Sequence, residues 1–219
     1  MALTTRANIR IKHHTVLTVI TALLLWAIYA LVPGDDKKYL WSMATAYTSI
    51  ILLGVTLILG PLNVMKNKNN PVSSDLRRDI GIWCGLTGIV HVIVGIQVHM
   101  GNIWLYFFKA VEGDESFQFR DDLFGAANYT GLIAGGILLM LLLISNDISM
   151  KMLRPGKWKR LQQFSYLFFV LTLVHSIMYQ VIEKRMLAII ICFACLMIVP
   201  LIMQFKGFLS INRKATQHK

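Results

Sequence analysis

The stretch MLAIIICFACLMIVPLIMQF, residues 186–205, contains no charged side chain. At a rise of about 1.5 Å per residue, a helix of this length crosses the ~30 Å hydrocarbon core of a bilayer. Five further apolar runs lie near residues 15–32, 40–62, 80–108, 124–144 and 161–181. The six runs predict an all-α, six-transmembrane-helix bundle that forms a single domain over residues 1–219 and is surrounded by the lipid bilayer.

The charged residues indicate how the bundle lies in the membrane. They make up only 15% of the chain and are concentrated between the apolar runs. Lysine and arginine are enriched at both ends of the chain and in the second and fourth loops, so the positive-inside rule predicts cytoplasmic N- and C-termini. Topology and contact with anionic lipid then explain the net charge of +11. No soluble basic domain remains to bind nucleic acid, and any soluble partner has to be a separate chain.

Three histidines lie inside the apolar runs, His91 and His99 in the third and His175 in the fifth, and it is the pair His91 and His175 that indicates a site. An imidazole within the membrane is costly and usually faces a site or a partner. From the expected cytoplasmic ends of their helices, these residues rise roughly 17 and 21 Å. Two imidazoles at one depth on neighbouring helices are suited to hold one haem iron axially. The alternative is that each histidine only makes a polar contact between helices.

The residues around His91 leave a second pair of alternatives open. Gly88 and Gly95 lie three residues before and four residues after it, on the same helix face. A porphyrin could lie flat against such a face, but glycines at this spacing also allow two helices to pack closely. His99 lies about 12 Å nearer the outside than His91. It is a candidate for an outer substrate, quinone or partner site, or else a plain interfacial histidine.

Two longer segments resemble a known family. They are DLRRDIGIWCGLTGIVH, residues 75–91, and GKWKRLQQFSYLFFVLTLVH, residues 156–175. Together they resemble the ferric-reductase-like transmembrane family, and within it most closely the haem-binding membrane subunit of the bacterial periplasmic methionine sulfoxide reductase system. The resemblance implies a transmembrane electron carrier of the bacterial inner (plasma) membrane that works with a soluble redox partner.

The chain departs from the two-haem members of that family. Those members have a second histidine nearer the cytoplasmic end of each of the two helices. The corresponding positions here are Arg78 and Gln162, so only the outer pair, His91 and His175, is retained. This plan resembles the single-haem STEAP metalloreductases, in which a flavin occupies the inner leaflet.

A single central or outer haem leaves a gap to the cytoplasm that an inner cofactor has to bridge. We expect a flavin (FMN or FAD) or a quinone at the inner ends of the third and fifth helices. Basic side chains would contact its phosphate or its reduced anionic ring, a glutamine amide would hydrogen-bond to it, and a tryptophan would stack on it. These residues are Arg77, Arg78, Lys159, Arg160, Gln162 and Trp158. The alternative is that the basic residues are only positive-inside anchors and the tryptophan an interface aromatic.

The expected function is therefore transmembrane electron transfer through one haem b. Electrons would pass from a cytoplasmic flavin or quinol to an extracytoplasmic acceptor, either a partner reductase or a metal. With both axial positions filled by histidine, the haem is expected to be low-spin, and no catalytic residue is assigned. Two alternatives remain. One is a cytochrome b of another family whose haem is ligated differently. The other is a non-redox six-helix transporter or assembly factor with structural intramembrane histidines, although no acidic residue lies at mid-depth to couple ions.

Overall fold

The computed structural model describes residues 2–67, 75–110 and 116–217, and most of them are helical. The helices are α1 (Ala2–Leu31), α2 (Lys37–Met65), α3 (Asp75–Gly95), α4 (Leu123–Leu143), α5 (Asp147–Gln162), α6 (Phe164–Ile182) and α7 (Leu187–Gln217). Within the described ranges, six segments are long and apolar enough to cross a membrane, and α5 and α6 together form one of them. The all-α six-helix bundle is thereby confirmed.

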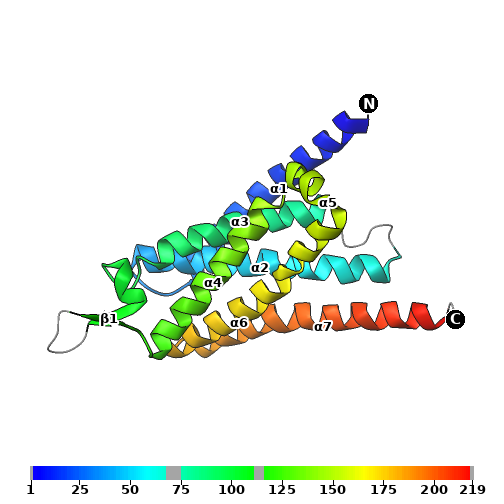
Figure 1. Cartoon of the computed structure of the whole chain (residues 1–219). Helices are drawn as coiled ribbons and strands as arrows, with labels where there is room; N and C mark the ends of the chain where they lie inside the picture. The colour runs from blue at the N-terminus through cyan, green and yellow to red at the C-terminus, as the bar shows by residue number, and fades with distance from the viewer. Residues whose placement is uncertain (1, 68–74, 111–115, 218–219) are drawn as a thin grey trace.

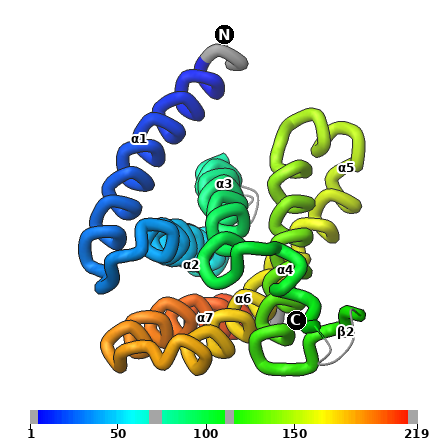
Figure 2. Tube along the Cα trace, turned by 90° about the vertical axis from the view of Figure 1, so that its left-hand side faces the viewer, coloured from blue at the N-terminus to red at the C-terminus, as the bar shows by residue number. Residues whose placement is uncertain are grey.

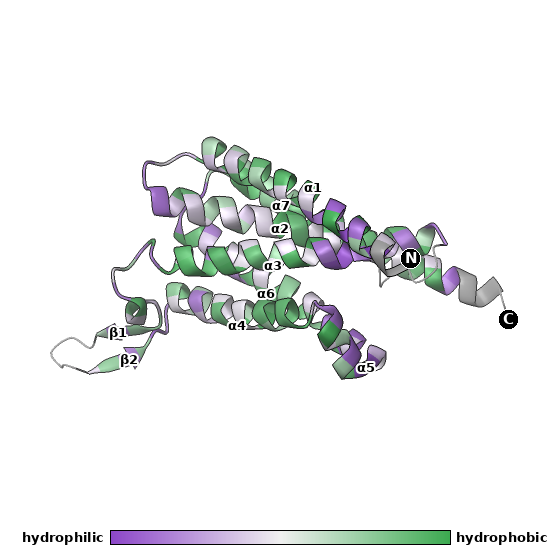
Figure 3. Cartoon of the chain, turned by 90° about the horizontal axis from the view of Figure 1, so that it is seen from above, coloured by the Kyte–Doolittle hydropathy of each residue, from purple (hydrophilic) through white to green (hydrophobic). Residues whose placement is uncertain are grey.

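The helices form an elongated bundle in which the two termini lie toward the same end (Figures 1 and 3). The α1–α2 and α6–α7 connections lie at the opposite end (Figure 1). Looking along the bundle, α2 packs against α1, α3 and α7, and α4 packs against α3 and α6 (Figure 2). Polar residues gather at the ends of the helices and apolar residues along their middles, as a bilayer requires (Figure 3).

The third span is shorter than its apolar run. The run was expected to continue to residue 108, but α3 ends at Gly95. A short 3₁₀ helix, η1 (Ile103–Tyr106), then turns the chain back, and its buried tyrosine accepts a hydrogen bond from the His99 amide (2.9 Å). The same hydroxyl donates to the Gly95 carbonyl at 3.2 Å. The Tyr106 hydroxyl therefore satisfies the Gly95 carbonyl, which has no partner within the helix, and so caps the end of α3.

A small hairpin follows in the predicted outer loop. Strand β1 (Phe108–Ala110) pairs antiparallel with β2 (Phe117–Phe119). Helix α4 then begins after Asp122, whose carboxylate accepts from the Gly125 amide at 2.7 Å. A hydrogen bond from the Arg120 guanidinium lowers the pKa of Asp122, which keeps this cap ionised. A negative charge also suits the N-terminus of a helix.

The fourth loop is itself helical. Helix α5 occupies most of the segment expected to connect the fourth and fifth spans. It bends at Arg154, where φ is +60°, directly before Pro155. Proline cannot continue the backbone hydrogen bonds of a helix, which explains the bend. The first and last helices likewise extend beyond their apolar runs of 15–32 and 186–205, because hydropathy detects only the part of a helix that suits lipid.

An ionic cluster ties the start of α1 to the start of α3. Asp79 is fully buried and accepts from Arg10 at 2.8 Å and from His13 at 2.9 Å. Beside it, Arg78 pairs with Asp147, the first residue of α5, at 2.6 Å. Three helices therefore meet at this end through charged groups, and a buried carboxylate is compensated by cationic and imidazole donors.

Candidate functional site

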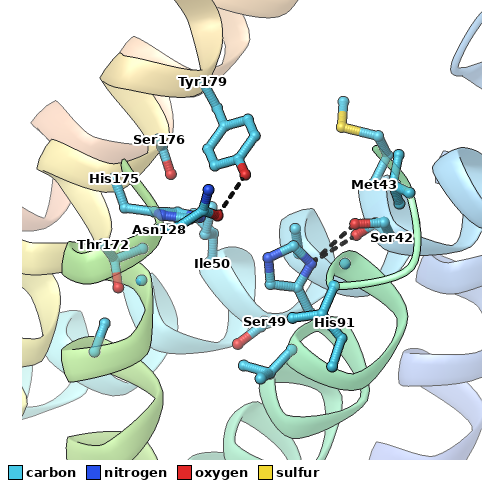
Figure 4. A pocket seen from close by; sticks show the side chains of 18 of the residues that line it. Ser42, Met43, Ser49, Ile50, His91, Asn128, Thr172, His175, Ser176 and Tyr179 are labelled. Carbon is cyan, nitrogen blue, oxygen red and sulfur yellow. Dashed lines mark hydrogen bonds between the residues drawn. The ribbon is translucent and has the colours of Figure 1, made fainter. Parts of the chain in front are cut away.

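The two intramembrane histidines face each other across one cavity. His91 projects from α3 and His175 from α6, and their ring centroids are 6.4 Å apart at an interplanar angle of 75°. Both helices pack on α4. The two histidine side chains point into the cavity from opposite walls (Figure 4). The structure therefore brings together the two residues that sequence reasoning paired by depth.

Each imidazole is fixed by a backbone carbonyl of a neighbouring helix. The Nδ1 atom of His91 donates to the Ser42 carbonyl of α2 at 3.0 Å, and that of His175 donates to the Ala127 carbonyl of α4 at 2.8 Å. Because a carbonyl only accepts, Nδ1 holds the proton in each neutral ring and Nε2 is left with its lone pair. A hydrogen bond of this kind is what usually orients a metal-binding histidine.

The distance between the rings matches axial coordination of one metal. A metal–imidazole bond is about 2 Å long, and bond lengths near 1.3 Å put each ring nitrogen about 1.2 Å from its centroid. Two such rings on opposite sides of one metal therefore have centroids roughly 6.4 Å apart. The observed separation is 6.4 Å. This separation of the ring centres is compatible with two histidines that share one metal.

The donor set fits a haem better than a bare ion. Among the described residues there is no group of three or more His, Cys, Asp or Glu side chains that could hold a metal. Protein zinc sites usually need three or four protein ligands, whereas a haem brings four nitrogens of its own and needs only axial partners. Two tethered imidazoles on opposite walls provide those partners.

The cavity is mostly apolar and has a volume of about 190 Å³. Typical small-molecule pockets measure about 300–1,000 Å³, so a porphyrin would have to displace side chains around the two histidines. The cavity also contains a polar atom that lacks a partner, because the buried Oε1 of Gln180 receives no hydrogen bond from a described residue.

The glycines divide between the two roles expected of them. A Cβ at Gly88 would lie 2.9 Å from the Ser49 hydroxyl and would clash with Leu138, so this glycine permits close helix packing. A Cβ at Gly95 would lie 3.6 Å from the His91 ring, so this glycine borders the site. A third glycine beside the site was missed from the sequence: a Cβ at Gly131 of α4 would lie 2.7 Å from the His175 ring. Gly131 therefore leaves the room that this imidazole occupies.

His99 lies in the same cavity as the histidine pair, toward the end formed by η1 and the α6–α7 turn. Its Nε2 pairs with Glu183 at 2.9 Å, and its ring stacks on Tyr179 at a centroid distance of 5.9 Å. The Tyr179 hydroxyl in turn donates to Asn128 at 2.8 Å (Figure 4). Sequence reasoning missed Tyr179 and Glu183, although their spacing of four and eight residues from His175 puts them near its face of the helix.

The residues expected to bind an inner cofactor do not gather around the cavity. Arg77 donates to the Thr56 carbonyl at 3.0 Å, and Arg78 is engaged in its ion pair with Asp147. Trp158 is buried, and its indole donates to the Ile144 carbonyl at 3.0 Å. This indole holds α5 against the end of α4, so α5 would have to move before Trp158 could stack on a ligand.

The remaining inner residues lie on or next to the second half of α5. Lys159 and Arg160 are exposed, and Gln162 has a buried Nε2 without a hydrogen-bond acceptor among the described residues. None of the six residues proposed for the inner site lines the histidine cavity. Arg78 lies about 20 Å along α3 from His91, so the inner end and the histidine pair are distinct regions.

Comparison with known proteins adds no assignment, because no family model and no curated protein matches the chain.

Proposed function

We propose that this chain is a b-type haem protein that transfers electrons across a membrane, with His91 and His175 as the axial ligands of one haem. The observation that supports this most is the histidine pair, with both Nδ1 atoms tethered and the ring centroids 6.4 Å apart. When bound, the haem supplies the one-electron chemistry, and its ligands and surroundings set its potential.

The chain's own residues would position and insulate the haem. The Ser42 and Ala127 carbonyls orient the imidazoles, and Gly131 leaves room for one of them. If His91 and His175 both held the iron, no site on it would be free for oxygen or another substrate, which favours electron transfer over catalysis at the metal. A buried apolar cluster adjoins the cavity and would insulate the haem; it includes Leu53, Leu57, Ile80, Phe168 and Phe169.

The site lies nearer the end of the bundle opposite the termini. His91 is four residues before the end of α3 and sixteen after its start, so it rises about 24 Å from Asp75 rather than the ~17 Å expected from the sequence. His175 lies about 16 Å into α6 and about 10 Å from the end of that helix. With cytoplasmic termini, the haem would serve the extracytoplasmic side, where a partner reductase or a metal accepts electrons.

Electron entry from the cytoplasm then requires a relay. The proposed donor is a flavin (FMN or FAD) or a quinol bound near the inner ends of α3 and α6, where Lys159 and Arg160 are exposed cations. This part of the proposal, like the bacterial inner-membrane location, is supported by the resemblance to ferric-reductase-like proteins and by the positive charge at this end.

Sealed vesicles test the transfer directly. Haem-loaded protein is reconstituted with FMN, NADH and a flavin reductase inside and a membrane-impermeant ferric chelate outside. We expect external iron reduction at several times the rate of empty vesicles. Vesicles with the His91→Ala variant serve as the matched control. Equal rates in all three preparations would contradict transmembrane electron transfer and leave the non-redox alternative.

A further inference from the structure

Arg185 lies in the short turn between α6 and α7 and lines the histidine cavity. Its Nη1 donates to the Tyr39 hydroxyl at 2.8 Å and contacts the Met43 sulfur at 2.6 Å. Its guanidinium carbon also lies 5.2 Å from the centre of the Tyr39 ring. The side chain is therefore held at the start of α2, at the end of the cavity near the predicted outer surface.

This cation lacks a counter-charge. Among the described residues Arg185 has no ion pair, and its guanidinium donates through Nη1 alone, to two neutral side chains. Glu183 lies only two residues away, but its carboxylate is paired with His99 at 2.9 Å. Arg185 is half-buried at the outer end of a mostly apolar cavity, and a guanidinium has five N–H donors, so its other nitrogens can bind an anion. A charge held in this way is compensated when an anion binds.

We propose that Arg185, positioned by Tyr39, binds a carboxylate of the ligand in the histidine cavity, namely a propionate of the haem. The inference rests on the proposed function, because haem b has two propionates at one edge of its ring. Arginine pairs with carboxylates in a planar, two-pronged geometry that lysine does not reproduce. The haem would then lie with its propionate edge toward the α6–α7 turn, and this contact would select one orientation of the macrocycle.

The test compares two ligands and four proteins. Haem-free protein in detergent is titrated with haem b and with haem dimethyl ester, whose propionates are uncharged, and binding is followed by absorbance. The proteins are wild type, Arg185→Gln, Arg185→Lys and the control Lys184→Gln, which removes the same charge from an exposed neighbouring residue. The wild-type comparison of the two ligands needs no mutation, so it stands even if a variant fails to fold.

The expected pattern is specific to a carboxylate contact. Losing one charge-assisted contact should weaken haem b binding roughly 10- to 100-fold in Arg185→Gln, with a smaller loss in Arg185→Lys. Wild type should bind the dimethyl ester more weakly by a similar factor, and Arg185→Gln should not weaken it further. Lys184→Gln should bind both ligands as wild type does.

Three results would overturn the inference. If wild type binds haem b and its ester equally well, or if Arg185→Gln keeps wild-type affinity for haem b, Arg185 does not bind a propionate while the His91–His175 haem still stands. If folded wild type takes up neither ligand, the proposed function fails and the inference fails with it.

Discussion

Replacing His91 or His175 by alanine is expected to abolish stoichiometric haem binding. Each residue supplies one of the two axial bonds, and even the loss of a group that only orients a ligand typically weakens metal binding 10- to 100-fold. We therefore expect each variant to bind haem at least ~100-fold more weakly than wild type. Haem per folded chain after purification measures this, with protein folding checked by circular dichroism.

A control and a rescue make the result specific. Val90→Ala changes the exposed residue next to His91 on the same helix and should keep its haem. Free imidazole added to either alanine variant should partly restore a low-spin spectrum, because it fills the space that the side chain left. A variant that retains one low-spin haem per chain without imidazole would show that the haem is ligated differently.

The second large effect is expected at Asp79, far from the haem. Its carboxylate is fully buried and accepts from Arg10 and His13, so Asp79→Asn removes the buried counter-charge of Arg10, which keeps only its longer contact with Asp147 at 3.5 Å. Breaking a buried ion pair or a charged hydrogen bond costs about 2–4 kcal/mol, and we expect a loss of that size in the free energy of unfolding. Unfolding in mixed detergent, followed by circular dichroism, measures it.

Asp147→Asn is the matched control for that variant. Asp147 also pairs with an arginine, Arg78, but its side chain is 43% exposed. Because water reaches the Asp147 carboxylate and screens its charge, we expect its removal to cost less, about 1 kcal/mol. If the two variants were destabilised equally, the cluster around Asp79 would not be the contact that joins α1 to α3.

The number and type of the spans were predictable from the sequence, because lipid excludes charge and forces the backbone to satisfy its own hydrogen bonds. The ends of the helices were not. The third apolar run continues past Gly95, and only the tertiary contact of the Tyr106 hydroxyl shows that the helix stops there. The helix α5 was missed for a related reason: it is polar, and hydropathy marks such a segment as a loop.

The candidate site was predictable in part. Depth along a helix paired His91 with His175, since 1.5 Å per residue applies to both. The groups that fix these imidazoles could not be found in this way, because Ser42 and Ala127 contribute backbone carbonyls that any residue type has. Arg185 was equally hidden, since an arginine in an outer turn has no distinctive pattern until the structure places it beside the cavity.

At the inner end of the bundle, the sequence suggested a site where the structure shows contacts between helices. A basic, tryptophan-containing segment before a span suggested a cofactor site, yet Arg78 and Trp158 are both used to hold α5 in place. Basic residues near a membrane surface can set the orientation of the helices or hold them together, and need not bind a cofactor. The inner flavin or quinone therefore remains a proposal to be tested separately from the haem.

The most direct test of the haem assignment is the absorption spectrum of the purified protein, oxidised and dithionite-reduced, together with the number of haems per chain. We expect one low-spin b-type haem per chain, with the reduced α-band typical of two histidine ligands. Well-folded protein that was expressed with haem supplied and contains none would contradict the haem assignment. Two haems per chain would show a second site that His91 and His175 do not provide.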